Sequence, residues 1–162
     1  MQNLLMVIDM QNDFVDGALG TKEAVAIVDN VAAYINKFDG NVLFTRDTHA
    51  DTYMHTLEGK FLPVAHCIEG THGWQLNDKI EQAKQKQGKR DLGVVDKTAF
   101  SDERVIEKIK EINDADSIRT ITLMGLCTDI CVISNAFVVK TLFPEKDIYI
   151  EGSCCAGVTP QG

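Results

Sequence analysis

Short apolar runs alternate with amphipathic stretches along this chain. Five runs are typical of buried strands, at residues 3–9, 41–46, 91–96, 118–125 and 147–151. Apolar residues at spacings of three and four predict helices over 22–38, 75–87, 102–113 and 129–142. Alternating strands and helices indicate parallel pairing through right-handed crossovers. We therefore predict an α/β fold, a Rossmann-like three-layer domain with a central parallel sheet flanked by helices, with residues 1–162 forming a single domain.

Two of these helices have a predicted buried face. In the helix at 22–38 the expected inward residues are Val25, Val28, Ala32 and Ile35. Thr21 is placed to cap its N-terminus. The helix at 102–113 should bury Val105, Ile106 and Ile109. The stretch 47–74 has no clean period and contains all four histidines. A loop of that length inside a compact domain is usually functional or disordered.

Charge and cysteine content exclude several function classes. The 162 residues include 16 Lys and Arg against 24 Asp and Glu, a formal net charge of −8, which argues against nucleic-acid binding and against electrostatic binding to membranes. There is no apolar run long enough for a transmembrane helix, and the N-terminus lacks signal-peptide features. We therefore expect a cytoplasmic protein whose five cysteines are thiols.

Charged residues follow three of the predicted strands, and a cysteine begins the helix after another. In parallel sheets functional groups collect beyond the carboxyl ends of the strands. That rule selects Asp9, Asp47, Lys97 and the segment after Gly125. Asp9 and Lys97 would each be costly as an isolated buried charge, so we expect them to meet. The pair is either a structural ion pair or part of a catalytic set.

Cys131 lies in the first turn of the helix predicted after Gly125. Backbone N–H groups at a helix N-terminus favour an anion there, which predicts a lowered thiol pKa and a site for an oxyanion. The alternative is a small buried cysteine with a packing role. Cys127 and Cys131 are spaced CxxxC, which disfavours a thioredoxin-like redox site. With Asp9 as base and Lys97 as electrostatic stabiliser, Cys131 could act as a nucleophile.

A second candidate group lies in the loop at 47–74. Asp47 and His49 point to the same side of an extended segment, and further candidate ligands downstream are His55, Glu58 and His66. A carboxylate with imidazoles suits Zn²⁺, Fe²⁺ or Mn²⁺. The alternative is a set of exposed histidines in a polar loop. His72 stands in a Gly-rich turn and is not expected to be a ligand.

Six segments in order carry a resemblance to a known family. They are LLMVIDMQNDF (4–14), TRDTH (45–49), LPVAHCIEGTHG (62–73), VDKTAF (95–100), GLCTDICV (125–132) and CCAGVTP (154–160). They span nearly the whole chain, which resembles the isochorismatase-like cysteine hydrolases and, within them, the nicotinamidases. The resemblance implies a homo-oligomeric amidohydrolase that converts nicotinamide and water to nicotinate and ammonia, a reaction of NAD salvage.

The resemblance also implies roles for individual residues. Asp9, Lys97 and Cys131 correspond to the catalytic triad, and a cis peptide before Cys127 places the N–H groups of Cys127 and Cys131 in an oxyanion hole. The implied ligands of a divalent metal, zinc by preference, are Asp47, His49, Glu58 and His66. The implied substrate-facing residues are Phe14, Gln11 and Phe100, although Phe14 and Phe100 could equally be core residues.

Three departures from the family pattern leave alternatives open. His55 competes with Glu58 as the fourth ligand, and we favour Glu58. An aromatic-Pro pair often precedes the segment of His66, whereas Phe61-Leu62-Pro63 stands here. The sequence therefore does not decide which side chains form the substrate pocket. The family also continues with a further helix beyond Gly162. The alternative activities are hydrolysis of a ureido, carbamoyl or aliphatic amide, or a non-catalytic binding role on the same fold.

Overall fold

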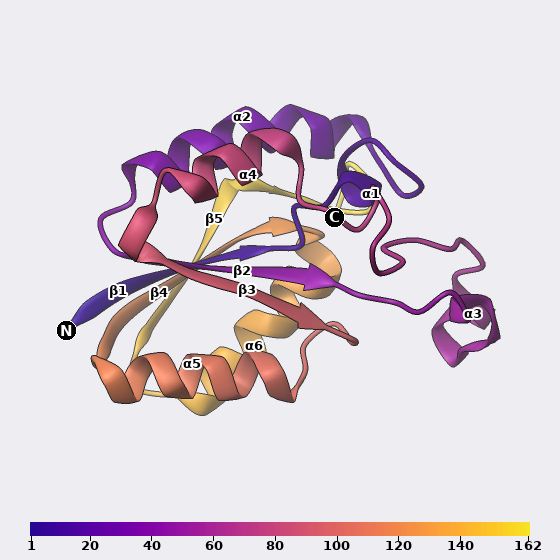
Figure 1. The fold of residues 1–162 in the computed structure, drawn as a ribbon. Helices are drawn as coiled ribbons and strands as arrows, with labels where there is room; N and C mark the ends of the chain where they lie inside the picture. Colours follow the sequence, from indigo (N-terminus) through magenta and orange to yellow (C-terminus); the bar gives the residue numbers. More distant parts are fainter.

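A parallel five-stranded sheet forms the centre of the computed structural model, which describes residues 1–162 (Figure 1). Its strands are β1 (Gln2–Ile8), β2 (Asn41–Asp47), β3 (Asp91–Lys97), β4 (Ile118–Leu126) and β5 (Asp147–Ala156). They are arranged in the order β3-β2-β1-β4-β5, and every pairing is parallel. The predicted fold class is confirmed. Each strand lies within a few residues of its predicted range, and β5 runs five residues longer than predicted.

Helices cover both faces of the sheet. They are α1 (Asn12–Val15), α2 (Lys22–Lys37), α3 (Leu57–Phe61), α4 (Asp78–Gln85), α5 (Glu103–Ala115) and α6 (Ile133–Leu142). Figure 1 shows α2 and α4 on one face and α5 and α6 on the other, with α3 set apart from the sheet. A π-helical turn, Thr128–Val132, leads into α6, and short 3₁₀ turns span Tyr53–His55 and Gly88–Arg90. The short helices α1 and α3 were not predicted, because a single turn has no measurable period.

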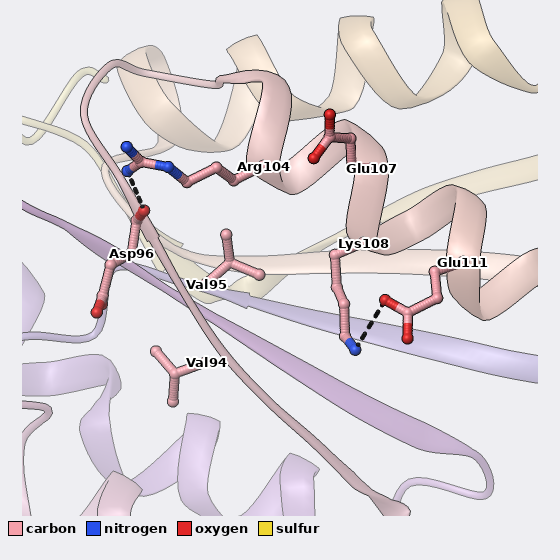
Figure 2. Close-up of a pocket in the computed structure, with 7 residues that line it drawn as sticks. All are labelled: Val94, Val95, Asp96, Arg104, Glu107, Lys108 and Glu111. Carbon is pink, nitrogen blue, oxygen red and sulfur yellow. Dashed lines mark hydrogen bonds and ion pairs between the residues drawn. The ribbon is translucent and has the colours of Figure 1, made fainter.

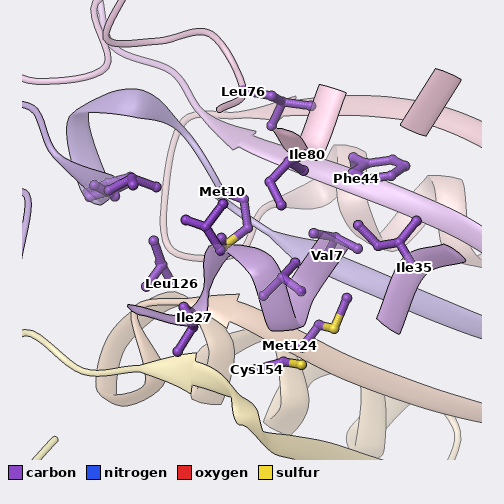
Figure 3. Close-up of a cluster of buried hydrophobic side chains, with 14 of the residues drawn as sticks. Val7, Met10, Ile27, Ile35, Phe44, Leu76, Ile80, Met124, Leu126 and Cys154 are labelled. Atoms are coloured by element: carbon purple, nitrogen blue, oxygen red, sulfur yellow. The ribbon is translucent and has the colours of Figure 1, made fainter. Parts of the chain in front are cut away.

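Alternating side chains of the central strand β1 build two apolar cores. Leu5 and Val7 point into the core beneath α2 and α4, and Figure 3 shows Val7 there beside Ile35 and Phe44. Leu4 and Met6 point into the other core, with residues of α5 and α6. Because both faces are covered, all of these β1 side chains are fully buried, as the continuous apolar run predicts.

The buried face of α2 differs from the prediction. Val25 is 52% exposed, whereas Ile27 and Val31 are buried together with Val28 and Ile35. Two stripes with a spacing of three and four overlap in this helix, and packing of α2 against β5 and α4 selects one of them. A similar shift occurs in α5, where the buried residues are Val105, Ile109 and Ile112, and Ile106 is only half-buried. The predicted N-cap is confirmed, since the Thr21 side chain accepts a hydrogen bond from the Ala24 N–H.

Strand β3, at one edge of the sheet, forms a shallow cleft of about 440 Å³ with α5 (Figure 2). Arg104 reaches back from α5 and donates a hydrogen bond to the Asp96 carbonyl at 2.9 Å. Lys108 and Glu111 form an ion pair along the helix. Charged side chains of this kind protect a sheet edge from pairing with another chain. The cleft contains neither group of predicted functional residues. No helix of the structure is both long and apolar enough to cross a membrane.

Candidate active site

The carboxyl ends of the strands bring the predicted triad residues together around Lys97. The Lys97 Nζ lies 2.7 Å from Asp9 Oδ2 and 3.5 Å from Cys131 Sγ. It also lies 3.6 Å from Asp47 Oδ1 and donates a hydrogen bond to the Ala99 carbonyl. Asp9 and Lys97 are fully buried and Cys131 is 5% exposed. Residues that are far apart in the sequence thus form one group at the sheet edge, as the strand-end rule predicts.

The turn after β1 directs the Asp9 carboxylate into this group. Asp9 has a left-handed φ of 48°, an uncommon conformation that bends the chain sharply where β1 ends. The Thr45 hydroxyl donates to Asp9 Oδ1 at 2.7 Å, and the Asp9 N–H donates to the Thr45 carbonyl. Gly125 on the neighbouring strand has φ 123°, and a Cβ there would collide with the Ile8 carbonyl. The glycine therefore permits β4 to approach β1 just before the segment that carries Cys131.

Burial and charge set the protonation of the group. Burial raises the pKa of Asp9 and outweighs the opposing Lys97 charge. Burial alone would lower the pKa of Lys97, but Asp9 and then Cys131 and Asp47 hold it well above its usual value. Burial, followed by the negative charge of Asp9, raises the pKa of Cys131 well above its ordinary value. The prediction of a lowered thiol pKa is therefore wrong, because burial and the charge of Asp9 outweigh the charge of Lys97.

The helix that carries Cys131 is held by a buried amide that sequence reasoning did not single out. Asn135 is fully buried, and its side-chain nitrogen donates to the carbonyl oxygens of Cys131 and Phe100, each at 2.8 Å. The peptide between Leu126 and Cys127 is cis, as the family resemblance implies. Cys127 and Cys131 both line the same pocket.

Four predicted metal ligands converge beside this group. One ligand atom from each of Asp47, His49, Glu58 and His66 lies within 4.8 Å of the other three. Asp47 Oδ2 is 2.9 Å from His49 Nε2 and 3.5 Å from His66 Nε2. Glu58 Oε1 is 3.8 Å from His49 Nε2. Two imidazoles and two carboxylates are a donor set that suits a divalent transition metal. The structure brings Glu58 to this group and leaves His55 and His72 exposed at the surface.

The environment of these ligands orients them. The His66 Nδ1 bonds to the Val64 carbonyl at 2.8 Å, which turns Nε2 toward Asp47. Burial alone would raise the pKa of Asp47, but hydrogen bonds with His49 and His66 and the Lys97 charge hold it well below its usual range. Burial alone would lower the pKa of His66, but its hydrogen bonds with Asp47 and the Val64 carbonyl, together with the charges of Asp47 and Glu58, raise it overall.

Two further residues support the predicted ligands, and neither was identified from the sequence pattern. Tyr53 is 1% exposed and packs edge-on against both His49 and His66. Asp13 accepts a hydrogen bond from the Cys67 N–H at 2.7 Å, directly after His66. Both lie in or contact the loop without periodicity. The only available signal was that this loop is long and rich in histidine.

A pocket of about 370 Å³ joins the two groups. Its remaining lining is mainly apolar, and the full set is Phe14, Leu19, Asp47, Glu58, Phe61, Leu62, His66, Phe100, Cys127, Ile130, Cys131 and Val158. Phe14 is 8% exposed and Phe100 is 48% exposed, so they occupy the inner and outer parts of the pocket. Phe61 and Leu62, which stand where the family often has an aromatic-Pro pair, both line the pocket. Gln11, predicted to face the substrate, lies elsewhere: it is fully buried and binds the backbone of Asp47 and Trp74.

Comparison with known proteins places this geometry in a family. A family model described as the isochorismatase domain matches residues 3–162. A curated Bacillus subtilis (strain 168) protein, described as an uncharacterized isochorismatase family protein PncA, is 33% identical over 147 residues, 84% of this chain and 77% of that protein. The chain belongs to the isochorismatase family.

Solved structures of two relatives have the same fold over nearly the whole chain. Nicotinamidase PncA from Bacillus subtilis superposes with a TM-score of 0.80 and 30% identity, covering 99% of this chain and 90% of that one. The pyrazinamidase/nicotinamidase of Streptococcus mutans UA159 gives a TM-score of 0.81 and 29% identity, covering 98% and 90%. The predicted family is confirmed, and with it the prediction of an amide-hydrolysing enzyme.

Proposed function

We propose that this amidohydrolase is a nicotinamidase, which converts nicotinamide and water to nicotinate and ammonia. One observation carries the proposal: a buried Asp9–Lys97–Cys131 group and a four-residue metal-ligand group open onto the same apolar pocket. The pocket size and apolar walls suit an aromatic ring, and its two polar ends suit a carboxamide and a ring nitrogen. The nicotinamidase and pyrazinamidase relatives support the same substrate class.

The proposed reaction begins with proton transfer between buried groups. Asp9 takes the thiol proton of Cys131, and the Lys97 ammonium, 3.5 Å from Sγ, stabilises the thiolate. Sγ attacks the carboxamide carbon, and the N–H groups of Cys127 and Cys131 hold the oxyanion, each worth ~2.7–4 kcal/mol of the barrier. Asp9 then returns the proton to the leaving ammonia, which leaves a thioester. Asp9 next removes a proton from water, and the oxygen attacks the thioester carbon and expels the Cys131 thiolate. Asp9 returns that proton to the sulfur, which regenerates the thiol and releases the carboxylic acid.

Asp47, His49, Glu58 and His66 would hold a divalent cation, with zinc, iron and manganese all compatible with this donor set. When bound, that cation supplies a Lewis-acid partner for the pyridine nitrogen and so orients the ring. Phe14, next to His66 with ring centroids 5.5 Å apart, and Phe100 then offer apolar surfaces for the ring. Because Phe14 is buried, its ring should form a fixed wall of the pocket. The exposed Phe100 ring should form a more mobile wall.

The charge of the pocket disfavours the carbamoyl amino acid alternative. Asp47 and Glu58 line the pocket, and none of its lining residues is Lys or Arg. A substrate with its own carboxylate would therefore find no basic side chain in the pocket lining to pair with. A neutral aromatic amide needs no such partner.

The test is ammonia release by the purified, zinc-loaded chain. Nicotinamide should be hydrolysed, and benzamide, which lacks only the ring nitrogen, should be a much poorer substrate. N-carbamoylglycine should not be hydrolysed. Cys131→Ala should abolish turnover, whereas Cys154→Ala, which alters another buried cysteine outside the pocket, should keep it.

Other outcomes would redirect the assignment. Turnover of N-carbamoylglycine without turnover of nicotinamide would reject the nicotinamidase activity. Equal turnover of benzamide and nicotinamide would remove the ring nitrogen from recognition. Loss of activity in Cys131→Ala but none on treatment with chelator would keep the triad and remove the metal from catalysis. Activity retained in Cys131→Ala would reject the mechanism.

A further inference from the structure

Gln11 makes a set of contacts that the proposed reaction does not use. Its side chain is fully buried in the turn between β1 and α1. Its Oε1 accepts a hydrogen bond from the Asp47 N–H at 2.7 Å. Its Nε2 donates to the carbonyl oxygens of Asp47 and Trp74, each at 2.8 Å. The carboxamide is thus bound on both of its polar atoms, and two of its three bonds go to one residue.

The pairing of β1 with β2 explains why Asp47 needs such a partner. The ladder between these strands runs as far as Val7 and Phe44, and the Asp9 N–H still reaches the Thr45 carbonyl. Beyond that point β1 has turned away, and the Gln11 N–H bonds to the Asp9 carbonyl instead. Asp47 follows Thr45 by two positions, so its N–H and C=O face the same side of the strand. The Gln11 carboxamide replaces the missing peptide group of β1 there, and satisfies backbone atoms that burial would otherwise penalise.

Asp47 is the residue where the two groups of the active site meet. Its Oδ1 faces the Lys97 ammonium at 3.6 Å, and its Oδ2 faces His49 and His66. A carboxylate shared in this way depends on the position of its own backbone. A small displacement of the strand end would lengthen contacts on one side or the other.

We propose that Gln11 is a positioning residue that holds the backbone of Asp47, so that one carboxylate serves both Lys97 and the metal-ligand group. The part of this inference that concerns metal rests on the proposed function. Loss of the Gln11 carboxamide should weaken divalent-metal binding while Cys131 remains in place. Residues that support metal ligands typically contribute about 10- to 100-fold to metal affinity.

Asn12 provides a matched control in the same turn. It is 6% exposed, and its side-chain nitrogen donates to the His72 carbonyl at 2.9 Å. Asn12→Ala therefore removes a buried amide that ties the same turn to the same loop, without touching Asp47. Gln11→Met keeps the length and burial of the side chain and removes all three hydrogen bonds. Gln11→Glu keeps the size and an acceptor for the Asp47 N–H, but an ionised carboxylate cannot donate to the two carbonyls.

The first measurement is the Zn²⁺ affinity of the full chain, from competition with a chromophoric chelator. Gln11→Met and Gln11→Glu should bind Zn²⁺ about 10- to 100-fold more weakly than the wild type. Asn12→Ala should stay within about twofold, since it leaves every ligand contact intact. Iodoacetamide should label the buried Cys131 at the same rate in all four proteins, whereas unfolding would expose this thiol and speed its labelling. Equal weakening in Gln11→Met and Asn12→Ala, or none in either Gln11 variant, would overturn the proposal.

A second measurement does not depend on metal. The Asp47 N–H donates to Gln11 Oε1, so its hydrogen exchange, followed by NMR, reports this contact directly. Exchange at Asp47 should be slow in the wild type and in Asn12→Ala, and much faster in Gln11→Met. If the wild type binds no Zn²⁺, the metal part of the proposed function fails, and exchange at Asp47 alone decides the role of Gln11. Unchanged exchange in Gln11→Met would refute that role.

Discussion

Lys97 is the buried charge on which the Asp9–Lys97–Cys131 group depends, and Lys97→Met should cost much of the stability of the fold. The Nζ of Lys97 lies 2.7 Å from Asp9 Oδ2, and both side chains are fully buried. Coulomb's law with an effective dielectric of about 20 gives about 6 kcal/mol of attraction at that distance, before the cost of desolvation. Removing one partner of such a pair leaves an uncompensated buried charge and typically costs about 3–5 kcal/mol. That is a large share of the about 5–15 kcal/mol by which a domain is normally stable.

Lys84→Met is the control, because it breaks an ion pair of the same length at a more solvent-exposed position. The Lys84 Nζ is also 2.7 Å from its partner, Asp91 Oδ2, but each side chain is 17% exposed. Pairs open to solvent are usually worth no more than about 1 kcal/mol. Urea denaturation of both variants at pH 7 would measure the difference. A loss in Lys97→Met no greater than that in Lys84→Met would refute the argument that burial makes the first pair essential.

The loss of stability in Lys97→Met should depend on pH. Without Lys97, burial raises the pKa of Asp9 in the folded state further above its unfolded value. A carboxyl whose pKa is higher in the folded state than in the unfolded state destabilises the fold wherever the unfolded carboxyl is ionised. The loss of stability in Lys97→Met should therefore be largest at neutral pH and shrink toward about pH 4. Adding Asp9→Asn to Lys97→Met removes the stranded charge and should restore more than half of the lost stability at pH 7. A loss that is constant with pH, or no recovery in the double variant, would count against the reasoning.

Three further predictions concern other parts of the chain. Asp9→Asn should abolish amide hydrolysis but speed the alkylation of Cys131 by iodoacetamide at pH 7, because the negative charge that raises the pKa of the thiol is gone; slower alkylation would contradict the electrostatic account. Glu58→Ala should weaken Zn²⁺ binding at least tenfold while His55→Ala leaves it unchanged, as measured by chelator competition; the reverse result would make His55 the fourth ligand. Thr21→Ala should lower the free energy of unfolding by about 1 kcal/mol in urea, through loss of the α2 N-cap, with turnover unaffected.

The central strands were predictable because a short, continuously apolar run between turn residues is typical of a strand buried on both faces. A strand such as β1, which is buried on both faces, must be continuously apolar, and a charged residue at its end must meet an opposite charge or water. The parallel arrangement then follows from the alternation of strands and helices. For this reason the meeting of Asp9 with Lys97 was predictable from residue type and chain position alone.

The helix faces and the long loop were less predictable, because local pattern does not determine them. Val25 and Ile27 fit apolar stripes of equal quality, and packing against β5 and α4 decides that Val25 is exposed. Similarly, His55 and Glu58 are both reasonable ligands by type. The helical turn at α3 decides which of them reaches His49, and a single turn leaves no periodic signal in the sequence.

By itself, the sequence determined the fold class and the strand ends that carry charge, and it identified the residues predicted to react, since these follow from burial and side-chain chemistry. The tertiary structure alone decided how those groups are held. In the folded chain Tyr53 packs against His49 and His66, and Gln11 binds the backbone of Asp47 instead of lining the pocket. The tertiary structure also raised the pKa of Cys131, because desolvation and the charge of Asp9 act through space. Such effects depend on distances between residues that are remote in the chain, and no local pattern records those distances.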